Sequence, residues 1–398
     1  MTPKIDRMVS LPPGHCVDVG RRCFVVNSLA AGSLLGLPAL LRAGETTNPV
    51  RAAGPRVLVD WHSHFVSNAE IKFFAARPKA PRLVIEGDGI ARLQNVDTAS
   101  FAGGISDFSA SDIATRIRHL DKNGIQRQLL THTVALGLDA TVPLEELKPL
   151  FRAFNDELAG VVHQHPDRFI GVAALPSADP HWAAEELIRG QRDLGFIGGA
   201  LPLNAFATLE GARTLAPLFA AAQKHRSHFF VHRAPANSAV PGQPPVIIPR
   251  DTEYARWALI SNSHLAAGGI TLGLTDFLDP YPDVSVQIIM LAGFLPYLVD
   301  SIVPAAERAG VKDPLAKLRR LYIDPGPYSR MGDWVQLACS KIGADRILFG
   351  SDYGVGGGDR GDIGPALATL DQALTPRQRE LVYVENSRAL LKLKGFNT

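Results

Sequence analysis

Cysteine is scarce in this sequence, with three residues among 398: Cys16, Cys23 and Cys339. Their spacing matches neither a zinc knuckle nor a disulfide framework. Any metal ion in the protein is therefore expected to be held by nitrogen and oxygen ligands.

The sequence also lacks an excess of charge of either sign. It has 41 basic and 39 acidic residues, a formal net charge of +2, and no basic stripe interleaved with aromatic side chains. We therefore expect no nucleic-acid partner. Hydrophobic residues make up 46% and charged residues 20% of a chain long enough to bury a sizeable core, which is typical of a globular enzyme.

The N-terminus has the pattern of an export signal. Paired arginines, Arg21 and Arg22, stand just before Phe24 and ahead of an apolar, Gly/Ala-rich stretch that ends near Gly44. This order is typical of a twin-arginine signal peptide. Small and polar residues interrupt the stretch, so no stable membrane span is expected after signal cleavage.

We predict a signal peptide and linker over residues 1–55, a mature domain over residues 56–398, and a periplasmic or exported location. A membrane anchor, a wrongly assigned start or a cytoplasmic protein are the alternatives.

From residue 57 onward, short apolar runs alternate with amphipathic stretches. The runs predict strands at 57–60, 127–131, 169–174, 197–201, 228–231, 285–290, 321–323 and 347–350. The stretches between and after them predict helices at 112–123, 144–165, 180–194, 212–224, 254–268, 294–309, 331–342 and 376–392. Strands that alternate with helices favour a parallel sheet, and eight of them predict an α/β fold of the (β/α)8 TIM-barrel type.

One segment departs from this alternation. RLVIEGDGIARLQ, residues 82–94, has two short apolar runs around a Glu-Gly-Asp-Gly turn. It predicts a small β-hairpin inserted after the first strand, in a loop on the face where barrel active sites lie. The hairpin would either wall a substrate pocket or be peripheral to it.

Two histidines, His62 and His64, follow the first predicted strand in VLVDWHSHF, residues 57–65. Residues two apart on a strand point to the same face, which suits a chelate. By itself the pair is a weak signal, because two polar residues at a strand end give the same pattern.

Two more metal-binding side chains follow other predicted strands. His232 ends the strand in HFFVHRAP, residues 228–235, and Asp352 comes just after the run in RILFGSDY, residues 346–353. The carboxyl ends of barrel strands converge on one site. Three imidazoles and one carboxylate there suit a divalent metal ion such as zinc.

Several stretches of this sequence resemble one known family. They are DWHSH (60–64), KNGI (122–125), HPDRFIG (165–171), ALP (174–176), LGFIG (194–198), FVH (230–232), GFLPY (293–297), Asp324 and RILFGSDY (346–353). In order and at suitable intervals, they resemble the amidohydrolase superfamily, in its amidohydrolase-related branch that includes aminocarboxymuconate-semialdehyde decarboxylase. The resemblance implies that His62, His64 and His232 bind metal, and that Asp352 binds metal or handles a catalytic proton.

The sequence departs from this family at one position. Relatives carry a histidine before the Gly-Gly-x-x-Pro segment, and the corresponding residue here is Met290, in QIIMLAGFLPY (287–297). A thioether cannot act as an acid or base at neutral pH. His264, His132 or Arg233 could take over the role if the loops bring them inward.

The resemblance implies a metal-dependent carboxy-lyase that acts on a small carboxylic acid. The alternatives are a metal-dependent hydrolase of a lactone, ester or amide, or a binding protein without turnover. Arg233 and Arg330, near strand ends, could bind a substrate carboxylate, although surface pairing would also explain them. His132 could face the same site. The resemblance also suggests a homodimer.

Overall fold

The computed structural model describes residues 55–87, 89–96, 105–245, 252–355 and 361–396, all within the compact unit Ala53–Thr398. The predicted signal peptide lies outside these residues. Among the described residues, none of the helices has the length and apolar character needed to cross a membrane.

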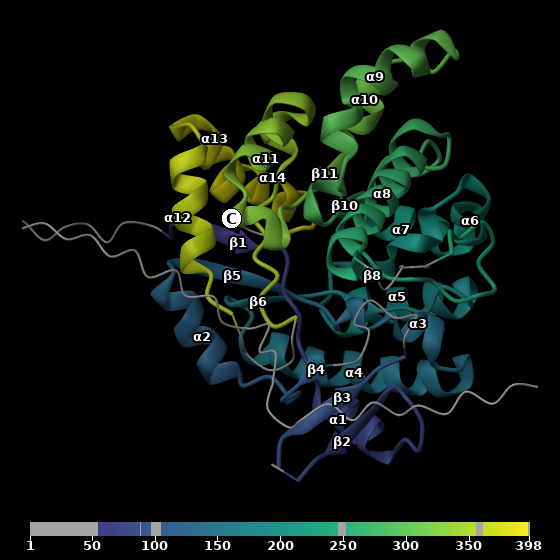
Figure 1. Cartoon of the computed structure of the whole chain (residues 1–398), viewed down its shortest axis with the longest axis vertical. Helices are drawn as coiled ribbons and strands as arrows, with labels where there is room; N and C mark the ends of the chain where they lie inside the picture. Colours follow the sequence, from purple (N-terminus) through teal and green to yellow (C-terminus); the bar gives the residue numbers. More distant parts are fainter. Residues whose placement is uncertain (1–54, 88, 97–104, 246–251, 356–360, 397–398) are drawn as a thin grey trace, which may run out of the picture. The chain divides into compact units, whose positions relative to one another are not determined.

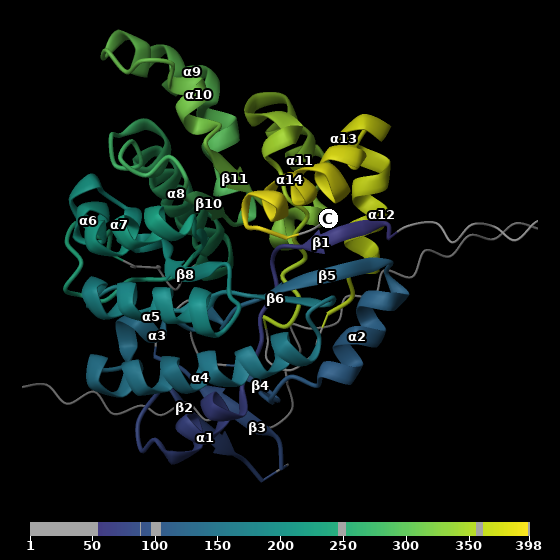
Figure 2. The same cartoon turned by 180° about the vertical axis from the view of Figure 1, so that it is seen from behind.

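Parallel strands form the centre of this unit (Figures 1 and 2). One sheet has the order β1 (Val57–Asp60), β5 (Ile125–Leu130) and β6 (Phe169–Gly171). The other has the order β11 (Leu321–Ile323), β10 (Ser285–Ile288), β9 (His228–His232), β8 (Gly198–Pro202) and β7 (Ala173–Ala174). Only Val172 separates β6 from β7, so the two sheets are continuous there.

The predicted eighth strand, 347–350, is not a strand. An isolated parallel bridge links Ile347 to Ile323, and the Leu348 N–H donates to the Ile323 carbonyl at 2.9 Å. On the other side, the Trp61 N–H donates to the Phe349 carbonyl at 2.8 Å. The segment therefore joins β11 to the end of β1 through one backbone hydrogen bond on each side. The chain has the (β/α)8 barrel fold.

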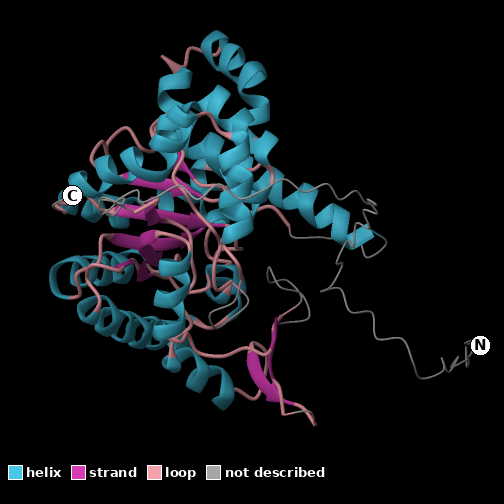
Figure 3. Cartoon of the chain, turned by 90° about the vertical axis from the view of Figure 1, so that its left-hand side faces the viewer, coloured by secondary structure: helices cyan, strands magenta, loops and turns pink. Residues whose placement is uncertain are grey.

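Helices surround the strands, as Figure 3 shows in cyan around magenta. The longer ones are α2 (Ile113–Lys122), α4 (Leu144–Gln164), α5 (Pro180–Asp193), α7 (Ala216–His225), α8 (Glu253–Leu274), α9 (Leu295–Arg308) and α12 (Gly364–Ala373). The shorter ones are α1 (Asn68–Ala76), α3 (Leu138–Thr141), α6 (Leu209–Thr214), α10 (Pro314–Leu318), α11 (Gly332–Ala338), α13 (Pro376–Glu380) and α14 (Asn386–Leu393). The predicted helix 212–224 is divided between α6 and α7, and the predicted helix 376–392 between α13 and α14.

Most strand residues are apolar because helices cover one face of the strands and the barrel interior the other. Every residue of β1, β8, β9 and β10 is buried. Helix starts follow local capping rules: the Asp112 side chain accepts from the Ala114 and Thr115 N–H groups at the start of α2.

The predicted hairpin is confirmed. Strands β2 (Arg82–Ile85) and β3 (Ala91–Gln94) pair antiparallel, and β4 (Ile105–Ser106) adds a third strand. This small sheet lies apart from the barrel strands, beside α1 (Figures 1 and 3). Leu93 on β3 is buried and joins the main apolar core, so the hairpin is anchored to the barrel unit.

Candidate metal centre

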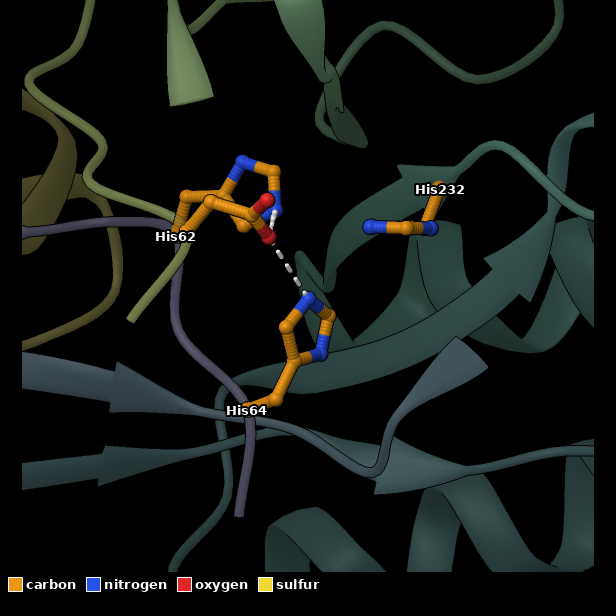
Figure 4. Close-up of side chains that lie close together, drawn as sticks. His62, His64 and His232 are labelled. Atoms are coloured by element: carbon orange, nitrogen blue, oxygen red, sulfur yellow. Dashed lines mark hydrogen bonds and ion pairs between the residues drawn. The ribbon is translucent and has the colours of Figure 1, made fainter. Parts of the chain in front are cut away.

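The structure brings His62, His64, His232 and Asp352 together. His232 is the last residue of β9, the other two histidines follow β1, and Asp352 follows the segment in the eighth strand position. One ligand atom from each residue lies within 4.8 Å of all the others. Figure 4 shows the three imidazole rings facing a common point. The histidines are buried, and the Asp352 side chain is 16% exposed, so solvent reaches the group from its side.

In each of the three rings, Nδ1 points away from the other ligands and lies next to a hydrogen-bond acceptor. His62 Nδ1 lies 2.7 Å from Asp324 Oδ1, and His64 Nδ1 and His232 Nδ1 lie 3.2 and 3.1 Å from the carbonyls of His132 and Arg233. Carbonyl and carboxylate oxygens accept, so all three Nδ1 atoms carry hydrogen, and Nε2 is the ring nitrogen available to a proton or a metal ion. Metal-binding histidines have this outer support.

The Nε2 atoms of the histidines and the carboxylate of Asp352 face one another, an arrangement that needs a cation to be stable. Asp352 Oδ1 lies 3.1 Å from Nε2 of both His62 and His64. His62 Nε2 is buried and has no partner with hydrogen-bond geometry. Lone pairs that converge beside a carboxylate are stable only with positive charge between them. The donor set therefore fits a divalent metal ion.

The electrostatics of the group show the same need for positive charge, which a proton on His62 or a metal ion can supply. Burial would lower the pKa of His62, but the carboxylates of Asp324 and Asp352 outweigh burial and raise it to about 10. Burial would raise the pKa of Asp352, yet the imidazoles of His62 and His64 hold it well below its usual range. The pKa of His232 lies well below its ordinary value because of burial and the neighbouring His64 and His62.

The backbone of Asp352 is held in an unusual conformation. Its φ is 62°, in the left-handed region that non-glycine residues rarely adopt. Its N–H donates to the His62 carbonyl at 2.8 Å. The preceding Ser351 donates from N and Oγ to the two carboxylate oxygens of Asp60, at 3.0 and 2.7 Å. These bonds stabilise a turn that directs the carboxylate at the histidines.

Of the three residues predicted to bind substrate, Arg233 directly follows His232 in the chain, and His132 accepts a hydrogen bond from His64 through its carbonyl. The Arg233 Cζ lies 3.9 Å from the centroid of the Trp257 ring, and its Nε is buried without a hydrogen-bond partner. His132 is buried against Phe151 and Phe154, and its Nδ1 also has no partner.

Arg330 lies elsewhere. It is exposed, donates to the Asp362 carbonyl at 3.0 Å, and lines a surface hollow with Trp334 and Gln372. None of the four metal-binding residues lines that hollow. A role for Arg330 in substrate binding stays a prediction, and these contacts favour its alternative, surface pairing.

Met290 follows β10 in a left-handed turn. Met290, Leu291 and Ala292 have φ values of 52°, 56° and 53°, and the Leu291 N–H donates to the Asp324 carbonyl at 2.7 Å. Met290 is buried in the apolar core. His264, on α8, is half-buried, and burial together with the charge of Arg233 lowers its pKa.

Three polar residues of the site were given no role by the sequence analysis: Asp324, Gln287 and Asp60. Asp324 comes directly after β11. The metal-binding residues were predicted from the same kind of position, at or just after the end of a strand, so the sequence did contain a signal for Asp324. Gln287 and Asp60 are polar residues inside buried strands, and their partners come from distant segments of the chain: Gln287 donates to Asp324, and Asp60 accepts from Gln128 on β5.

Fold and site together define a class of protein: a (β/α)8 barrel that gathers nitrogen and oxygen ligands for a divalent metal ion at the carboxyl ends of its strands. A family model described as amidohydrolase matches residues 59–393. The chain therefore belongs to the amidohydrolase family.

Individual relatives are decarboxylases. The chain is 26% identical over 303 residues to a gamma-resorcylate decarboxylase of Rhizobium radiobacter, covering 71% of this chain and 87% of the relative. Two similar solved structures are 5-carboxyvanillate decarboxylases. That of Sphingomonas paucimobilis has a TM-score of 0.63, is 17% identical, and is matched over 84% of this chain and 99% of its own. That of Novosphingobium aromaticivorans, complexed with manganese, has a TM-score of 0.59, is 18% identical, and is matched over 87% and 98%.

Proposed function

We propose that this protein is a metal-dependent carboxy-lyase that removes CO2 from a small aromatic carboxylic acid. The observation that carries the proposal is the group His62, His64, His232 and Asp352, with the charge of Arg233 near enough to lower the pKa of His232. The decarboxylase relatives support the reaction type and the aromatic substrate class.

Arg233 is the residue we assign to the substrate carboxylate. Burial lowers its pKa to about 10, with Asp352 and Tyr328 opposing the change, so the guanidinium stays charged at neutral pH. Its buried, unpartnered Nε offers a donor, and Trp257 holds the side chain in place. A charged donor with unused hydrogens suits a carboxylate. His132 would form part of the same substrate site.

Asp352 would handle the proton. A bound divalent ion would supply Lewis-acid stabilisation of negative charge on the substrate. The depressed pKa of Asp352 keeps it ionised, and a carboxyl of low pKa is a strong acid once it has accepted a proton. Asp352, whose side chain is 16% exposed, would take a proton from solvent water and pass it to the substrate carbon, where the electron pair of the broken carbon–carbon bond becomes the C–H bond. CO2 would leave and combine with the hydroxide as bicarbonate, and Asp352 would again be ionised.

A hydrolase acting on a lactone, ester or amide is the second candidate. It is favoured by the same depressed pKa of Asp352, because an ionised carboxylate in that position can accept a proton from an attacking water. The third possibility, metal binding without turnover, is favoured by the buried Met290 at the position of the family histidine.

Three finer points belong to the proposal. Zinc is our expected metal, but the N/O ligand set also accepts manganese, which one solved relative carries. A homodimer is expected. Export is proposed from Arg21 and Arg22 and is tested by cell fractionation, where an Arg21→Lys, Arg22→Lys variant should accumulate in the cytoplasm.

The deciding experiment is a product assay. The chain is loaded separately with Zn²⁺ and Mn²⁺ and incubated with a panel of hydroxybenzoic acids and of lactones and esters. Release of CO2 from an acid supports the proposal, and hydrolysis of a lactone or ester without CO2 release supports the hydrolase. Stoichiometric metal with neither product refutes both reactions.

A further inference from the structure

A line of buried polar side chains runs through the barrel interior beneath His62. Ser285 on β10 is paired in register with His228 on β9, and Gln287 lies two residues further along the same face of β10. Asp324 follows β11, the next strand. His228, Gln287 and Asp324 are fully buried. Barrel interiors are ordinarily filled by branched apolar side chains, so this polar line needs a reason.

The direction of each hydrogen bond follows from Gln287. Its Nε2 lies 2.6 Å from Asp324 Oδ2 and 3.1 Å from the Trp61 carbonyl, and both of these atoms accept. The amide group can therefore point only one way, with its Oε1 toward His228 Nε2 at 3.1 Å. His228 Nε2 must donate, which leaves His228 Nδ1 to accept from the Ser285 hydroxyl at 3.0 Å.

The donor and acceptor roles fixed by Gln287 also determine the hydrogen bond between Asp324 and the metal-binding His62. Gln287 occupies Oδ2 of Asp324, so Oδ1 is left to accept from Nδ1 of His62 at 2.7 Å. With hydrogen on Nδ1, Nε2 is the nitrogen of His62 left to bind a metal ion, and it faces His64, His232 and Asp352. Burial lowers the pKa of His228 to about 3, with the charge of Lys394 adding to the effect, so His228 stays neutral as this direction requires.

We propose that Ser285, His228 and Gln287 are positioning residues that act through Asp324 to fix the tautomer and ring orientation of His62, and so set the metal affinity of the site. The inference rests on the metal centre of the proposed function, and it holds for a lyase or a hydrolase alike. Orienting partners of metal-binding histidines are worth about 10–100-fold in affinity.

The test compares metal affinity in matched variants of the full chain. Gln287→Met keeps the length of the side chain and removes the donors to Asp324. His228→Leu removes the donor to Gln287, whereas His228→Gln can still supply one. Asn155→Leu is the control, because Asn155 is an equally buried amide whose bonds go to Ala174 and Glu186, away from the metal-binding residues.

Each protein is loaded with Zn²⁺ or Mn²⁺ and titrated against a chromogenic chelator, with its fold checked by circular dichroism and urea unfolding. We expect Gln287→Met to weaken metal binding by about 10–100-fold. His228→Leu should weaken it less, His228→Gln should stay near wild type, and Asn155→Leu should lose stability without losing affinity.

Unchanged affinity in folded Gln287→Met overturns the inference, as does an equal loss of affinity in Asn155→Leu. If Gln287→Met does not fold, the two His228 variants provide the test. His228→Leu should then have a lower metal affinity than His228→Gln, and equal affinities of these two variants overturn the inference. Metal affinity is measured without turnover. A wild-type protein that binds metal and releases no CO2 therefore refutes only the proposed reaction.

Discussion

The guanidinium of Arg233 lies over the ring of Trp257, 3.9 Å from its centroid, and directly follows the metal-binding His232 in the chain. We predict that Arg233→Lys raises KM for the acid substrate by about 10-fold or more, with a smaller effect on kcat, because lysine loses both the planar donor set and the stacking. Steady-state kinetics on the metal-loaded enzyme measure both constants.

Arg330→Lys is the matched control for this prediction. Arg330 is exposed and donates to the Asp362 carbonyl, so we expect its replacement to leave KM within about twofold of wild type, as is usual for surface changes. An equal rise of KM in both variants would remove Arg233 from its assigned role.

The His62 and His64 pair is tested directly by metal content. We expect elemental analysis to find near-stoichiometric metal in the wild-type chain and almost none in the His62→Ala, His64→Ala variant, because half of the ligand set is gone. His181→Ala, at an exposed position on α5, should keep its metal. Metal retained by the double variant would show that the ion binds elsewhere.

Much of the metal centre could be predicted from the sequence because it depends on strand ends. His62, His64, His232 and Asp352 each follow an apolar run, and the carboxyl ends of parallel strands meet at one end of a barrel. The sequence therefore predicted that these four residues lie together, whereas Asp324, which also follows a strand, was given no role.

The supporting residues could not be predicted in the same way. Gln287 is a polar residue in a buried strand, and only the folded barrel brings its amide to Asp324 and Trp61. Similarly, the run 347–350 is as apolar as a strand, but its backbone makes only isolated hydrogen bonds to the neighbouring segments. The residue pattern does not reveal this difference.

Gly350 has no room for a side chain next to the metal centre. A Cβ at this position would lie 2.7 Å from Asp324 Oδ1 and 2.8 Å from the Cβ of His62. We expect Gly350→Ala to displace this pair, lowering the free energy of unfolding by about 1–3 kcal/mol and weakening metal binding. Urea unfolding and chelator competition measure the two effects.

Gly160→Ala provides the opposite case. Gly160 lies inside α4, and a Cβ there would meet nothing within 4 Å. We expect this change to stabilise the protein by about 0.5–1 kcal/mol, because alanine favours the helix, and to leave metal affinity unchanged. If Gly350→Ala behaves like Gly160→Ala, the close packing around His62 and Asp324 does not control the site.

Glu70 makes stability depend on pH at a position away from the metal. It is buried in the first turn of α1, where Oε2 accepts from the N–H and the hydroxyl of Ser67 at 2.8 and 3.0 Å. Burial raises its pKa from 4.5 to about 7, the charge of Glu157 adds to the rise, and the bonds from Ser67 oppose it.

A raised carboxyl pKa means that the folded state holds a proton that the unfolded state has released. The resulting stability is fully present below pH 4.5 and is lost as pH rises to about 7, with a total on the order of 3 kcal/mol. Glutamine resembles the protonated form and can keep the capping box with Ser67. We therefore expect Glu70→Gln to match wild type near pH 4 and to be more stable at pH 8, as measured by urea unfolding across this range. A difference between the two proteins that is constant with pH would mean that burial does not shift the ionisation of Glu70.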